Sequence, residues 1–71
     1  MMSSPNKPLT VGTRVLLTHT PWYTEEGVWF TLISKRSWDG SDWWEALSDK
    51  GETIHLMDGG EILSSALVEG A

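Results

Sequence analysis

The sequence contains no cysteine, and this absence removes several kinds of chemistry. Disulfide bonds, thiolate metal sites and cysteine nucleophiles are all excluded. A chain of 71 residues without such cross-links has to be stabilised by a single apolar core, close to the lower size limit for such domains. This requirement favours a small closed barrel, in which many contacts are shared, over an open sheet.

Basic residues and long hydrophobic runs are also scarce. Five Lys and Arg residues stand against ten Asp and Glu residues, which gives a net charge of −5. Nucleic-acid binding needs a dense cationic patch, and the only adjacent basic pair is Lys35–Arg36, so we expect no nucleic-acid partner. No segment approaches the ~20 apolar residues of a membrane span, and residues 1–8 lack the apolar centre of a signal peptide. We therefore expect a soluble cytoplasmic protein that does not contact membranes.

Sequence patterns of catalysis and metal binding are missing as well. The two histidines, His19 and His55, are far apart in the chain and form no local ligand spacing. There is no nucleophile-elbow motif. The pair Gly59–Gly60 lacks the following Lys and Ser or Thr of a phosphate-binding loop. The sequence thus predicts a protein that is not an enzyme and has no cofactor or metal ion.

Tryptophan, in contrast, is abundant: there are five in 71 residues. One Trp side chain buries about 200 Å², and the core of so small a domain has room for few of them. Some of the indole rings are therefore expected on the surface. An exposed aromatic cluster usually marks a contact site. The composition predicts a small module that binds another molecule.

Short segments rich in β-branched and aromatic residues alternate with glycine-containing turns, a pattern typical of a small antiparallel β-barrel. The Asp39–Gly40 pair is the strongest hairpin signal. We expect a loose tail over 1–8 and one all-β domain over 9–71, with four to five strands. The expected elements are strands at 13–18, 28–34, 43–48 and 53–57, with turns at 37–41 and 49–52, then one helical turn and a last short strand within 61–68.

The two-residue period of a strand predicts which side chains share a face. Within 28–34, the even-numbered residues lie on one face and the odd-numbered residues on the other. In the next strand, Trp44 and Ala46 point one way, while Trp43 and Glu45 point the other. A large ring beside a small alanine is typical of a core, so we expect Trp44 to be structural and Trp43 to be available for contacts.

The run Gly-Ser-Asp-Trp-Trp-Glu-Ala at 40–46 resembles the start of the third strand of SH3 domains. There, an acidic or polar turn precedes a Trp-Trp pair and a small buried Ala follows. The family's Ala-Leu-Tyr-Asp-Tyr and Pro-x-x-Tyr elements are absent. The resemblance implies an SH3-like barrel in which Trp43 lines a groove for Pro-rich ligands. It also implies that Glu25 and Glu26, in a long loop between the first two strands, attract basic ligand residues.

Aromatic residues in the expected loops and at the third strand form our hypothesis for the binding site. Aromatic anchors with an acidic rim suit a basic or Pro-containing peptide, or a basic protein surface. A variant of this hypothesis is a phage or mobile-element inhibitor that docks on a host protein. The aromatic residues are Trp22, Tyr23, Trp38 and Trp43, and the acidic residues are Glu25, Glu26, Asp39 and Asp42.

Two other functional classes compete with this hypothesis. A Tudor-like barrel uses several rings to surround a quaternary ammonium or a methylated lysine. Alternatively, several copies of a small barrel assemble into an enzyme with one shared site. The mass of the protein in solution separates the assembled enzyme from the two binding modules.

Overall fold

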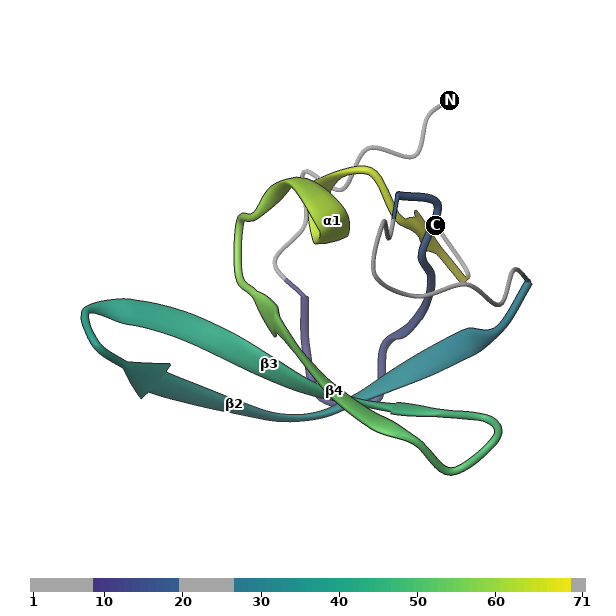
Figure 1. Ribbon diagram of the computed structural model, residues 1–71, viewed down its shortest axis with the longest axis horizontal. Helices are drawn as coiled ribbons and strands as arrows, with labels where there is room; N and C mark the ends of the chain where they lie inside the picture. The colour runs from purple at the N-terminus through teal and green to yellow at the C-terminus, as the bar shows by residue number, and fades with distance from the viewer. Residues whose placement is uncertain (1–8, 20–26, 70–71) are drawn as a thin grey trace.

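The computed structural model describes residues 9–19 and 27–69 and shows one strongly curled antiparallel sheet (Figure 1). The strands are ordered β4-β3-β2-β1-β5 across the sheet. The expected all-β class, with four to five strands and one helical turn before the last strand, is confirmed. The elements are β1 (Arg14–Leu16), β2 (Trp29–Trp38), β3 (Ser41–Ser48), β4 (Thr53–Met57), α1 (Glu61–Ser64) and β5 (Leu67–Val68).

The hairpin between β2 and β3 is longer than expected, and the prediction that Trp38 lies in a loop is wrong. The chain turns within Asp39 and Gly40 alone, whose φ angles are 57° and 80°. Positive φ at both central residues defines a two-residue turn whose twist matches that of the flanking strands. The strands therefore remain paired up to the turn, and Trp38 is the last residue of β2, opposite Ser41.

A β-bulge divides β2 into two parts. Leu32 pairs with Ala46 and Ser34 pairs with Glu45, which leaves Ile33 as an extra residue. A bulge shifts the alternation of side chains by one position and bends the strand. Before the bulge, the even-numbered residues of β2 face the core. After it, Arg36 and the other even-numbered residues lie on the opposite face of the sheet.

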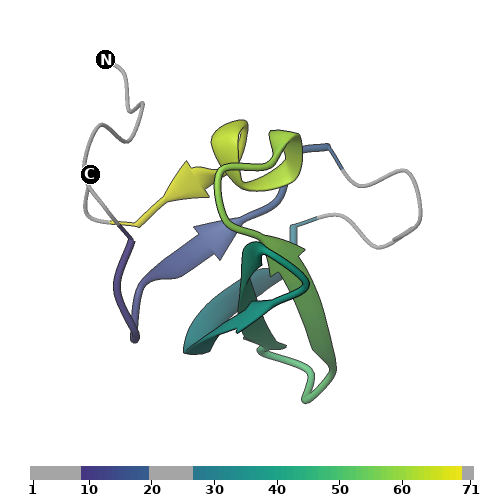
Figure 2. The ribbon, with the colours of Figure 1, turned by 90° about the vertical axis from the view of Figure 1, so that its left-hand side faces the viewer.

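The core lies inside the curl of the sheet and contains the residues that the two-residue period predicted. Phe30 and Leu32 are buried, and so are Trp44 and Ala46, whereas Trp43 on the other face is half-buried. The helix α1 connects β4 to β5 (Figure 2) and contributes Leu63 to this core. The buried apolar residues are Val15, Phe30, Leu32, Trp44, Ala46, Leu56, Leu63 and Ala66.

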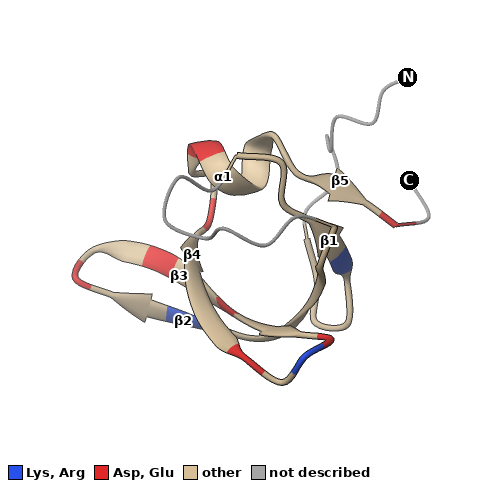
Figure 3. Cartoon of the chain, turned by 45° about the vertical axis from the view of Figure 1, so that its right-hand side comes forward, with Lys and Arg blue, Asp and Glu red and all other residues tan. Residues whose placement is uncertain are grey.

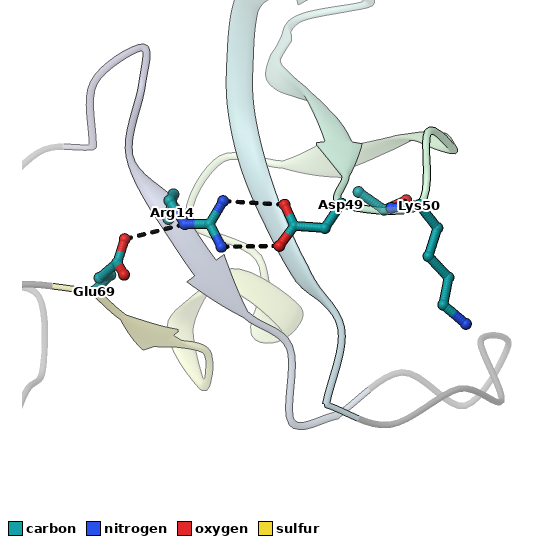
Figure 4. A network of polar contacts seen from close by, with 5 residues as sticks. Arg14, Asp49, Lys50 and Glu69 are labelled. Atoms are coloured by element: carbon teal, nitrogen blue, oxygen red, sulfur yellow. Dashed lines mark hydrogen bonds and ion pairs between the residues drawn. The ribbon is translucent and has the colours of Figure 1, made fainter.

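An ionic clasp centred on Arg14 joins three parts of the chain (Figure 4). Its guanidinium donates two parallel hydrogen bonds to Asp49, at 3.0 and 2.9 Å, and its Nε lies 3.0 Å from a carboxylate oxygen of Glu69. These contacts connect β1 with the β3–β4 turn and with the residue that follows β5. The hydrogen bond from Arg14 lowers the pKa of Asp49, and the same bond raises the pKa of Arg14. The guanidinium also lies 5.7 Å from the centre of the Trp29 ring.

Candidate binding site

Trp43 forms a wall between two depressions on the surface. The larger, which we call the α1 groove, has a volume of about 500 Å³, within the range of ligand-binding clefts. It lies where the outer face of β3 and β4, the face turned away from the core, meets the turn that leads into α1. The α1 groove is lined by His19, Trp43, His55, Leu56, Met57, Gly60, Glu61 and Ile62.

The sheet register and a close turn bring these residues together. Trp43 and Met57 are cross-strand partners, so their side chains lie side by side on the outer face. The backbone N–H of Gly60 donates a hydrogen bond of 3.0 Å to the Met57 carbonyl oxygen. A Cβ atom at residue 60 would lie only 3.1 Å from that same oxygen. Glycine at this position therefore allows the chain to fold back tightly, so that Glu61 and Ile62 also line the groove.

The acidic group of the α1 groove is Glu61, which was not among the predicted site residues. Its side chain is 82% exposed, and one carboxylate oxygen lies 3.7 Å from Nε2 of His19. Glu61 belongs to no local motif. Only the fold, which brings the start of α1 beside β4, places it in the same depression as Trp43. An exposed carboxylate beside an apolar wall favours a ligand that carries a basic group.

The smaller depression, which we call the hairpin depression, has a volume of about 300 Å³ and lies on the other side of Trp43. The rings of Trp38 and Trp43 form its aromatic corner, with centroids 6.1 Å apart and planes inclined by 52°. Trp38 is 66% exposed. The structure thus brings together two of the aromatic residues predicted for the site. The hairpin depression is lined by Arg36, Ser37, Trp38, Trp43, Glu45 and His55.

The two described acidic residues of the predicted rim line neither depression. Asp42 alternates with Trp43 and is directed to the opposite face of β3. There it accepts a hydrogen bond of 2.6 Å from the Ser37 hydroxyl and lies 3.8 Å from the ammonium nitrogen of Lys35. Asp39 is exposed in the hairpin turn and lines neither depression. The acidic residue that lines a depression together with Trp43 and Met57 is therefore Glu61 and not Asp42.

Trp44 is held by protein contacts on every side, as expected of a structural residue. Its indole N–H donates a hydrogen bond of 3.0 Å to Asp58. The Lys35 ammonium lies 5.4 Å from the centre of the indole ring and 3.4 Å from a carboxylate oxygen of Asp58. Since its ring is buried and its only polar atom is satisfied, Trp44 offers nothing to a ligand.

Four of the predicted site residues lie outside the described part of the chain: Trp22, Tyr23, Glu25 and Glu26. Of the residues that the prediction missed, Met57 and His55 could have been found by pairing the expected strand at 53–57 with the strand at 43–48. That register places Met57 opposite Trp43 and His55 opposite Glu45. Arg36 was missed because the predicted strand ended at residue 34, whereas β2 extends to Trp38 and pairs Arg36 with Trp43.

The described residues contain neither a group of possible metal ligands nor a helix that could span a membrane. Over residues 9–19 and 27–69, no three His, Asp or Glu side chains are grouped so that they could hold a metal ion. The single helix described there, α1, has four residues and is far too short to cross a membrane. Among the described residues, the acidic positions are spread along the chain over β3, the turns and the start of α1 (Figure 3).

Comparison of the chain with protein-family models, with curated proteins and with solved structures finds no match. The function of the protein therefore has to be inferred from the two depressions on either side of Trp43.

Proposed function

We propose that this protein is a non-catalytic interaction module that binds an extended segment of another protein in the α1 groove. The observation that carries the proposal is the juxtaposition of the Trp43 indole, the apolar side chains of Met57 and Ile62, and the exposed carboxylate of Glu61 in one depression. Proline and aliphatic side chains pack well on such an apolar surface. A Lys or Arg beside them would pair with Glu61.

The sequence resemblance supports the same assignment. Residues 40–46 resemble the start of the third strand of SH3 domains, where the first Trp of the pair lies in the ligand groove. The corresponding residue here is Trp43, which lines both depressions. Hot-spot residues of protein interfaces are often Trp side chains that sit in well-packed central positions. We therefore expect Trp43 to contribute more to binding than any other described residue of the groove.

A Tudor-like aromatic cage is less well supported. Trp38 and Trp43 do form a corner of two inclined rings, which is half of such a cage. However, Arg36 lines the same depression, and its guanidinium would repel a quaternary ammonium or a methylated lysine. The peptide-binding module is the function that we conclude from the geometry.

Selection from a library of random peptides tests this proposal. We expect peptides enriched on the wild-type protein to share Pro or aliphatic residues next to a Lys or Arg. Trp43→Ala should weaken their binding by at least about tenfold, because truncation of a central Trp removes a hot spot. Leu47→Ala is the matched control, since Leu47 is exposed on the same face of β3 and lines neither depression. Equal binding by the Trp43→Ala variant would refute the proposal.

A further inference from the structure

Arg36 is an exposed cation without a carboxylate partner among the described residues, in a chain with twice as many acidic as basic residues. Two other cations have two carboxylates each: Arg14 contacts Asp49 and Glu69, and Lys35 contacts a second acidic pair. An acidic chain offers many possible partners for a guanidinium. The exposed position of Arg36 leaves its donors available to a ligand.

The surroundings of Arg36 suit a carboxylate. Arg36 is the cross-strand partner of Trp43 and lines the hairpin depression together with Trp38. A guanidinium can donate two parallel hydrogen bonds to one carboxylate, and the planar fork of its donors matches the geometry of that group. The acid in this depression is Glu45, one of whose carboxylate oxygens already accepts a hydrogen bond of 2.9 Å from the Ser34 hydroxyl.

We propose that the hairpin depression is a second subsite for the same ligand and that it binds a carboxylate through Arg36. The apolar part of the ligand next to that carboxylate would pack against Trp38 and Trp43. The inference rests on the proposed function, because the shared lining residues Trp43 and His55 place this depression directly beside the α1 groove. The ligand then carries charges of both signs, a basic group beside Glu61 and a carboxylate beside Arg36.

A titration with three small probes tests this subsite. N-acetyl-Phe-Glu-amide carries a side-chain carboxylate, N-acetyl-Phe-Gln-amide carries none, and N-acetyl-Gln-Phe carries a C-terminal carboxylate. Binding is followed at low ionic strength through the indole N–H resonances of Trp38 and Trp43 in the 71-residue protein. We expect at least one carboxylate probe to bind up to about fivefold more tightly than the amide probe, as for an exposed ion pair. The carboxylate probe that binds more tightly shows whether the carboxylate of the ligand comes from a side chain or from a C-terminus.

Arg36→Gln should abolish the preference for the carboxylate, and Arg36→Lys should retain part of it, because an ammonium lacks the planar fork of the guanidinium. The control is Lys50→Gln, which removes the same charge from the β3–β4 turn. Equal binding of all three probes, an absence of binding, or an equal loss in the Lys50→Gln variant would each overturn the subsite. If the selected peptides depend on Trp43 but the probes show no preference, the subsite alone fails. If the probes show the preference but the peptides do not depend on Trp43, the proposed function fails instead.

Discussion

The two faces of β3 place adjacent tryptophans in very different surroundings. On the inner face, Trp44 is 2% exposed and contacts Asp58 and Lys35. On the outer face, Trp43 is half-buried, with a depression on each side and the exposed Trp38 ring beside it. The two adjacent indoles therefore differ in their surroundings although they are neighbours in the chain. Trp44 fills part of the core, whereas Trp43 borders two depressions on the surface.

Exposure on the outer face is not sufficient to make a contact residue. Trp29 lies on the same face as Trp43, at the other end of the sheet, but the guanidinium of Arg14 covers its ring. Asp49 holds that guanidinium in place through two hydrogen bonds. Trp29 is therefore an outer-face residue with a structural role, which leaves Trp38 and Trp43 as the described indoles available to a partner.

The largest effect is expected from Trp44→Ala. Truncation of a buried Trp costs about 3–5 kcal/mol of unfolding free energy, a large share of the stability of so small a domain. Trp43→Ala should cost far less, because its ring is half-buried and borders open depressions. Urea unfolding of both variants measures the difference. Equal losses would show that Trp43 belongs to the core.

An intermediate effect is expected on the rate of binding. Association of a basic peptide with the α1 groove should slow as salt is raised, because the Debye length shortens to about 8 Å at physiological ionic strength. Glu61→Gln should remove part of this salt dependence and lower the association rate at low salt, with a smaller effect on the dissociation rate. Stopped-flow or surface-based kinetics with a selected peptide provides the measurement.

Asp39→Asn is the matched control for the Glu61→Gln experiment. It removes the same charge from the hairpin turn, and Asn tolerates the positive φ of that position. If Asp39→Asn changes the salt dependence more than Glu61→Gln does, the acidic contact lies at the tip of the hairpin and not beside α1.

The smallest effect concerns the clasp that covers Trp29. The folded state lowers the pKa of Asp49, so the stability contributed by the Asp49–Arg14 pair is fully present above the ordinary carboxyl pKa of about 3.9. This contribution to stability is lost as the pH falls from about 3.9 through the lower pKa that Asp49 has in the folded state. Unfolding free energies of the wild type and Asp49→Asn should therefore converge as the pH is lowered from 6 toward about 2.5. A constant difference between the two proteins would contradict the role of the ion pair.

Much of the fold could be predicted because its signals are local. The Asp39–Gly40 turn and the two-residue period of β3 are encoded by neighbouring residues, and both are present in the structure. The candidate site was predicted less well because it depends on distant partners. Met57 joins Trp43 through the pairing of β3 with β4, and Glu61 joins it through the turn into α1. Neither the register between strands nor the direction of a turn can be obtained from one segment alone.

The bulge at Ile33 has a consequence for how this protein can change over time. All of the buried residues that β2 contributes to the core precede the bulge, and the residues that line the hairpin depression follow it. Substitutions at Arg36 or Trp38 are therefore expected to alter the proposed contact surface without disturbing the packing of Phe30 or Leu32. Mutations in the part of the hairpin beyond the bulge can therefore produce a new binding surface while the domain keeps its fold. This part is the segment to randomise when the domain is used as a binding scaffold.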